Sequence, residues 1–429
     1  MIASLMAAFR IPDLKKRITF LFAMFAVYMI GLHISVPGIN TEAVGKAFGE
    51  GGLFDLLDAF TGGAFKKFTI FAMGIMPYIN ASIIMQLLTI AIPQLEALQK
   101  EGAAGQKKIR LYTRWLTGVM ALFQAYGTTT MIRQAGAIPG ASSALDFRVI
   151  QIAIVLVAGT AFLMYLGEQI SDKGIGNGVS IVIFAGIIAY LPNQIISTIT
   201  VEGVQNNRWF VIALLGTLFV ATVAFIVAIT QAQRKIPIQH VKRVVGNRMV
   251  GGSSSFLPLK INSAGVIPII FALSIMSFPV TVVNILLHGD KESIWYGLAL
   301  GISPGGAWYG SVAYALLIIF FTYFYTAVTF NVKEVSDNLK KWGSFIPGIR
   351  PGKPTQDYLD KIMTRITLAG AVFLAIVALL QYLVPQWLRV TTFSLIGGTS
   401  LLIVVGVALE TMQAIESHLL MRHYEGFIK

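Results

Sequence analysis

Few residues in this sequence have the types and the spacing that enzyme chemistry requires. The sequence contains no cysteine, which excludes disulfides, thiolate metal sites and a cysteine nucleophile. Its five histidines form no group with metal-ligand spacing. Neither the H-E-x-x-H zinc motif nor the G-x-S-x-G nucleophile turn is present. We therefore predict that the protein is not an enzyme and holds no catalytic residue, metal or cofactor.

The nearest match to a nucleotide site is a short stretch that contains Gly348, Gly352 and Lys353. Its spacing is one residue shorter than that of a phosphate-binding loop. Pro354 also stands where such a loop has the Ser or Thr that binds magnesium. We expect no nucleotide to bind here, so any energy for work must come from a partner.

The composition indicates a membrane protein. Of the 429 residues, 55% are hydrophobic and only 12% are charged, about half of the roughly 25% that soluble domains carry. A helix needs about 20 apolar residues to cross the hydrocarbon core of a bilayer. Ten segments meet this requirement: 18–37, 68–92, 115–132, 149–167, 179–201, 209–231, 264–288, 308–331, 366–385 and 390–411.

These runs do not alternate between polar and apolar residues, which excludes an outer-membrane β-barrel. We predict an all-α polytopic membrane protein with ten transmembrane helices. The loops that include both termini hold 25 of the 33 Lys and Arg residues, and the other loops hold 8. The positive-inside rule therefore places both termini in the cytoplasm.

The ten spans divide into two halves, residues 1–201 and residues 202–429. An odd number of spans in each half gives the two halves opposite orientations in the membrane. Inverted repeats of this kind favour a central pathway between two halves that rock against each other.

The net charge of +13 is concentrated in two long loops, 232–263 and 332–365. Anionic lipid headgroups would attract such loops by about 1 kcal/mol for each basic residue. Alternatively, the loops form a docking platform for an acidic partner or for ribosomal RNA. Each loop exceeds the length needed to join two neighbouring helices, which favours docking.

The predicted spans contain almost no charge, and only Glu410 falls within them. Ion-coupled transporters usually keep ionisable groups at mid-membrane, so this absence disfavours a transporter. Several spans instead carry uncharged polar residues: Asn80, Gln124, Ser274 and Ser277. Such residues are either ordinary hydrogen-bonding contacts between helices or the lining of a seam that can part.

The segment 53–65 has apolar residues at helical spacing, namely Leu53, Phe54, Leu56, Leu57 and Phe60. Gly62 and Gly63 end this pattern. A helix of that length is about 20 Å long, which is too short to cross the bilayer. It either lies on the outer membrane surface or enters the bundle from outside, with the paired glycines as a hinge.

Four stretches of the sequence resemble one family. Residues 74–89 read GIMPYINASIIMQLLT, residues 167–178 read GEQISDKGIGNG, residues 257–268 read LPLKINSAGVIP, and residues 346–352 read IPGIRPG. In this order they resemble SecY, the family of channel subunits of the bacterial protein translocase. The resemblance runs from about Arg10 to about Tyr424.

The resemblance implies a central pore between the two halves and a re-entrant plug at 53–65. Six aliphatic residues would form the pore ring: Ile75, Ile79, Val179, Ile183, Ile270 and Ile403. The lateral gate would lie between the second and third spans and the seventh and eighth, lined by Asn80, Gln124, Ser274 and Ser277. Arg350 would engage the motor ATPase SecA, and the loop with Arg243 and Lys260 would bind SecA and the ribosome.

The implied function is a passive channel in the bacterial cytoplasmic membrane. It would translocate unfolded preproteins and release transmembrane segments sideways into lipid, together with the small subunits SecE and SecG. A secondary transporter for a small solute remains the main alternative, and an intramembrane enzyme is a third.

Overall fold

The structure is a computed structural model of the chain. It describes residues 9, 11–48, 58, 61–140, 143, 146–205, 208–240, 243–245, 248–250, 254–286, 293–304, 306–388, 390 and 398–427. The first half of the chain contains the helices α2 (Pro12–Gly31), α3 (Thr41–Phe48), α5 (Met76–Ala91), α6 (Pro93–Lys100), α7 (Ala103–Gln134), α8 (Phe147–Lys173), α9 (Gly178–Thr198) and the π-helix η1 (Ile199–Gln205). The second half contains α10 (Trp209–Gln231), α11 (Ile267–Leu286), α12 (Ile294–Ile302), α13 (Trp308–Thr329), α14 (Val332–Lys341), α15 (Lys353–Leu388) and α16 (Thr399–Phe427).

Each of the ten predicted spans overlaps one long helix, namely α2, α5, α7, α8, α9, α10, α11, α13, α15 or α16. Among the described residues, six helices are long and apolar enough to cross a membrane by length and composition alone, or seven if the bent pair α5–α6 is one span. The remaining predicted spans correspond to helices that are shorter or more polar. The prediction of an all-α polytopic bundle is confirmed.

The prediction of a helix from residue 68 is wrong, because α5 begins only at Met76. Residues 68–75 form a series of buried turns, with φ of 45° at Phe68 and 56° at Gly74. Backbone hydrogen bonds to the segment after α2 satisfy this stretch: Val36 N donates to the Phe68 carbonyl at 3.0 Å, and Ile70 N donates to the Ile34 carbonyl at 3.0 Å. Hydropathy reports burial, and a buried turn that finds such partners is as apolar as a helix.

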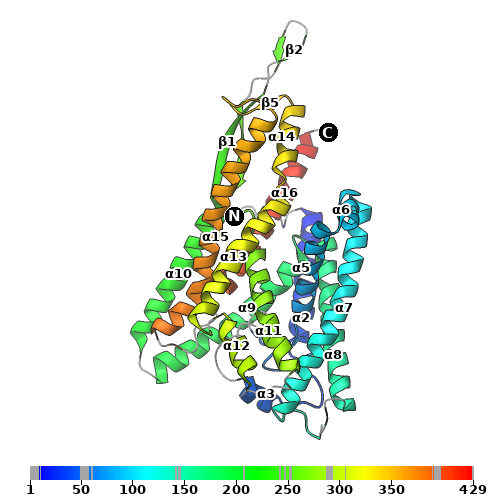
Figure 1. Cartoon of the computed structure of the whole chain (residues 1–429), viewed down its shortest axis with the longest axis vertical. Coiled ribbons are helices and arrows are strands. Elements are labelled where there is room, and N and C mark those ends of the chain that lie inside the picture. The colour runs from blue at the N-terminus through cyan, green and yellow to red at the C-terminus, as the bar shows by residue number, and fades with distance from the viewer. Residues whose placement is uncertain are drawn as a thin grey trace.

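The two basic loops contain regular structure that the sequence analysis did not predict. Strand β1 (Gln233–His240) pairs antiparallel with β4 (Ser254–Lys260) on one edge and with β5 (Ser344–Phe345) on the other. Between β1 and β4, β2 (Arg243–Val245) pairs with β3 (Arg248–Val250). Figure 1 shows β2, β5 and α14 at one end of the molecule and α3 and α12 at the other.

The largest apolar cluster unites helices from both halves. It contains buried residues of α2, α5, α8 and α9 from the first half, and of α11, α13, α15 and α16 from the second. On the seam between the halves, α11 packs against α5 and α7. Burial of apolar surface at roughly 25 cal/mol per Å² therefore holds the halves together around one centre.

The approach of the buried turns to α8 depends on Gly159. A Cβ placed at Gly159 would lie 1.8 Å from the Ile70 carbonyl oxygen, a backbone atom that cannot rotate away. We expect Gly159→Ala to destabilise the protein by about 2–3 kcal/mol through this overlap, measured as a lower thermal unfolding midpoint in detergent. The control is Gly216→Ala on α10, where a Cβ would meet nothing within 4 Å. That variant should be neutral or slightly stabilised, and equal losses in both variants would contradict the account.

Candidate functional site

The six aliphatic residues predicted for the pore ring belong to one apolar cluster. Ile75, Ile79, Ile183 and Ile403 are buried members, with exposed fractions of 7% or less. Val179 and Ile270 are half-buried and pack against the same cluster. The six residues come from α5 with its preceding residue, α9, α11 and α16. All six therefore lie in or against the central core of the bundle, and their role as a constriction stays a prediction.

The four polar residues predicted for the lateral gate line one cavity of about 90 Å³. Asn80 comes from α5, Gln124 from α7, and Ser274 and Ser277 from α11. A cavity of this size holds several water molecules. The Ser274 hydroxyl is buried and finds no hydrogen-bond partner among the described residues.

The segment predicted as a plug is described only in part. Leu53, Phe54, Leu56, Leu57 and Phe60 lie outside the described residues. Asp58 is fully buried, and Thr61 and Phe65 are buried and line the same cavity as the four polar residues.

Hydrogen bonds and a close packing contact fix the end of this segment. Asp58 accepts a hydrogen bond from Lys66 N at its Oδ1 (2.8 Å) and one from Gly63 N at its carbonyl (2.8 Å). Gly62 has a φ of 74°, and a Cβ there would lie 3.1 Å from the backbone of Gly186 on α9. Glycine is required at Gly62 both by its conformation and by this approach.

The predicted docking residues lie at the end of the molecule that carries the strands. Arg350 is exposed in the turn between β5 and α15, and its carbonyl accepts a hydrogen bond from the Thr355 hydroxyl at 2.8 Å. Lys260 is exposed at the end of β4, and its Nζ donates to Gln413 Oε1 of α16 at 2.8 Å. Arg243 lies in β2.

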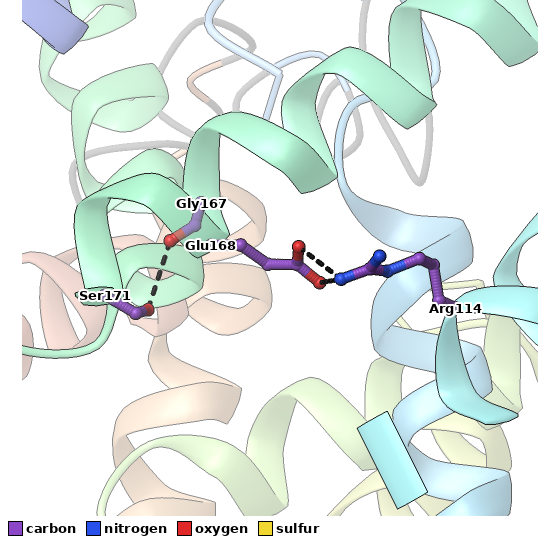
Figure 2. A network of polar contacts seen from close by, with 4 residues as sticks. All are labelled: Arg114, Gly167, Glu168 and Ser171. Carbon is purple, nitrogen blue, oxygen red and sulfur yellow. Dashed lines mark hydrogen bonds and ion pairs between the residues drawn. The ribbon is translucent and has the colours of Figure 1, made fainter. Parts of the chain in front are cut away.

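Sequence reasoning missed an ion pair between α7 and α8. Arg114 Nη2 donates to both carboxylate oxygens of Glu168, at 2.9 and 2.7 Å, as Figure 2 shows. One turn further along α8, the Ser171 hydroxyl donates to the Gly167 carbonyl at 3.1 Å and accepts from Gly178 N at 2.9 Å. The two Ser171 contacts fix the turn that leads into α9, which begins at Gly178. The sequence did contain a signal for this ion pair, because the two opposite charges lie at adjacent ends of two neighbouring predicted spans.

Comparison with known families identifies the family of this chain. The model of the SecY family matches residues 69–412, most of the chain. The chain belongs to the SecY family. Three protein translocase subunits SecY show the extent of the similarity. The one from Streptomyces galbus is 43% identical over 440 residues, covering 100% of both chains. The one from Thermotoga maritima is 43% identical, covering 98% of this chain and 96% of its own. The one from Halalkalibacterium halodurans is 45% identical, covering 98% of both.

Solved structures of more distant proteins share the SecY fold. A protein-conducting channel superposes with a TM-score of 0.63 at 19% identity, covering 94% of this chain and 92% of that one. Sec61 in a canine ribosome–channel complex superposes with a TM-score of 0.60 at 17% identity, covering 94% and 92%. At these identities the likeness shows the fold, which is a multi-pass membrane bundle.

Proposed function

We propose that this SecY family chain is the protein-conducting channel of a translocase. The observation that carries the proposal is that all six aliphatic side chains, from both halves of the chain, belong to or pack against the largest apolar cluster. An apolar constriction excludes ions by dewetting when it is narrow. Flexible aliphatic side chains can also surround an extended polypeptide without recognising a particular sequence. The channel is therefore passive, and SecA or the ribosome drives the movement.

The seam between α5 and α7 on one side and α11 on the other is proposed as the lateral gate. Its cavity is lined in part by polar side chains, among them Asn80, Gln124 and Ser277, so separation of the helices exposes some groups that water can solvate. A threading segment that reaches the open seam can exchange water for lipid, which favours an apolar segment by about 25 cal/mol per Å². Transmembrane segments leave sideways, and polar segments continue across.

The described part of the plug supports a position inside the bundle rather than on its surface. Asp58, Thr61 and Phe65 are buried, and irregular backbone at membrane depth requires surrounding protein or cavity water. We propose that residues 53–65 close the outer side of the ring.

The basic end of the molecule is proposed as the cytoplasmic docking surface. Exposed Arg350 and the β2–β3 tip with Arg243 extend from this end. They suit contact with SecA, with ribosomal RNA, and with anionic lipid headgroups. Both termini would then be cytoplasmic, and the membrane would be the bacterial cytoplasmic membrane. SecE and SecG are the proposed companion subunits.

Import into proteoliposomes tests the proposed function. The chain is reconstituted with SecE and SecG and is given an unfolded precursor, SecA and ATP. We expect the precursor to become protected from protease only when motor and ATP are present. Uptake of a small solute driven by an ion gradient alone would instead support the transporter alternative.

A pair of cysteines introduced across the seam can report gate opening. No native cysteine competes with them, because the chain has none. Asn80→Cys and Ser274→Cys place thiols on opposite sides of one cavity. We expect a short bismaleimide to join them in the resting channel and to fail when a precursor is arrested in it. The control pair is Arg114→Cys and Glu168→Cys, which join two helices of the same half. A seam crosslink that forms equally with and without precursor would contradict the gate.

A further inference from the structure

Helix α16 carries the proposed ring residue Ile403, and the first turn of this helix is buried. Thr399 begins α16, and the exposed fractions of Thr399, Ser400 and Ile403 are all 1% or less. The first N–H groups of a helix have no partner within the helix, so a buried first turn needs hydrogen-bond acceptors from elsewhere. The source of these acceptors therefore limits where α16 can begin in the bundle.

A side chain of α15 supplies an acceptor for this turn. Gln381 is 2% exposed, and its Oε1 accepts one hydrogen bond from Thr399 N at 3.2 Å and another from the Thr399 hydroxyl at 2.5 Å. A helix usually finds such an acceptor in the side chain of its own N-cap residue. The residue before Thr399 is Gly398, which has no side chain, so the acceptor comes from a neighbouring helix. We call the two hydrogen bonds between Gln381 and Thr399 the interhelical cap.

Close packing holds α16 at the same point. Gly398 has a φ of 84°, and a Cβ there would lie 2.6 Å from the Cβ of Gln381 and 2.8 Å from the Val377 carbonyl oxygen. The backbone that enters α16 thus lies directly against α15. The Gly398 carbonyl also accepts a helical hydrogen bond from Leu402 N at 3.1 Å. Sliding or rotation of α16 relative to α15 would therefore break the interhelical cap.

The interhelical cap lies one helical turn from the proposed ring. Ile403 comes four residues after Thr399, so the two side chains share one face of α16. The axial distance between them is about 6 Å at a rise of 1.5 Å per residue. Ile403 also belongs to the same apolar cluster as Val377 and Ala378 of α15. Because the backbone hydrogen bonds of one turn hold Thr399 and Ile403 together, a displacement of the first moves the second.

We propose that Gln381 is a positioning residue for the resting seal of the channel, because its two hydrogen bonds to Thr399 fix the depth at which α16 presents Ile403 to the ring. This inference rests on the proposed function of the six aliphatic residues as a constriction. It adds a polar contact outside the ring on which the closed position of one ring residue depends.

Two substitutions of Thr399 separate the hydrogen bond from the packing. Thr399→Val keeps the shape of the side chain but removes the hydroxyl, whereas Thr399→Ser keeps the hydroxyl but removes a methyl group. We expect Thr399→Val to raise the resting ion conductance in planar bilayers about threefold, through loss of one hydrogen bond. Thr399→Ser should conduct as the wild type does. If packing alone held Ile403 in place, the order of the two variants would be reversed.

Gln381→Met removes both bonds of the interhelical cap and keeps an unbranched side chain of similar length. We expect it to raise the resting conductance about tenfold, because two lost hydrogen bonds shift the closed–open equilibrium by roughly that factor. The control is Met363→Ala, since Met363 is also buried on α15 but packs in the cluster beside the strands of the basic loops. This variant should unfold at a lower temperature in detergent and still conduct as the wild type does.

A leak in Thr399→Ser as large as that in Thr399→Val would overturn the proposal, because lost packing would then explain both. Wild-type conductance in Gln381→Met, or an equal leak in Met363→Ala, would overturn it as well. If Gln381→Met does not fold, the order of the two Thr399 variants still decides. Failure of the proposed function is a separate result, since it would be a wild-type chain that imports no precursor in the presence of SecA and ATP.

Discussion

Replacing Arg350 by glutamate is expected to reduce SecA-driven import of a precursor at least about 100-fold, because like charges at an interface cost several kcal/mol. The side chain of Arg350 is exposed and forms no hydrogen bond or ion pair with the described residues. The folded state should therefore lose less than about 0.5 kcal/mol. Import into proteoliposomes and the thermal unfolding midpoint measure the two effects separately.

The matched control is Lys333→Glu. Lys333 is exposed on α14 in the same loop, and its replacement changes the net charge by the same amount. We expect this variant to import the precursor at close to the wild-type rate. Equal losses in the two variants would mean that the loop acts through its total charge, and normal import by Arg350→Glu would remove the docking assignment.

Replacing Ile403 by glycine is expected to open an ion leak through the resting channel. Ile403 is fully buried on α16, and loss of its side chain would widen the proposed ring and let water enter it. The substitution should also cost about 3–5 kcal/mol of stability through the cavity and the helical glycine. Conductance in planar bilayers measures the leak after the folded fraction has been isolated.

Leu402→Gly is the control for this substitution. Leu402 is the preceding residue of α16, is 1% exposed and belongs to the same apolar cluster. It should lose a similar amount of stability but conduct no more ions than the wild type, because it is not in the proposed ring. A leak of equal size in both variants would show that general loosening of the core, and not a constriction, controls conductance.

Hydropathy predicted the long helices well, because a helix that crosses a bilayer must have a long run of apolar residues. The predicted span 209–231 coincides with α10 (Trp209–Gln231), a helix whose surface is mostly open to its surroundings. The same measure failed at 68–75, where turns are as buried as a helix and are hydrogen-bonded to the segment after α2. Hydropathy cannot distinguish a buried helix from such buried turns, because in both the backbone groups are hydrogen-bonded and water is excluded.

The strands in the two basic loops could not be predicted by counting spans either. In β1, Ile236 and Ile238 are buried and alternate with exposed residues, which is the period of a strand. That alternation covers only a few residues, and a search for long apolar runs does not register it. In the same way, α15 begins at Lys353, well before its apolar part, because an amphipathic first section extends the helix beyond the membrane.

For the candidate site, the residue types could be predicted from the sequence but their assembly could not. The polar residues Asn80, Gln124 and Ser274 lie far apart along the chain, and only folding places them on one cavity. Glu202 and Arg208 form an ion pair and are close in sequence, yet Arg208 also donates to the Leu388 carbonyl, 180 residues away. Periodicity within one segment carries no information about such a partner.

Photocrosslinking of an arrested precursor tests the central claim most directly. A photoreactive amino acid is placed at Ile79, at Ile403, and at Ile376 of α15, which is 49% exposed. The account predicts that a precursor stalled during import crosslinks to positions 79 and 403 and not to position 376. A precursor that crosslinks to position 376 but to neither ring position would contradict the claim that the chain passes through the centre of the bundle.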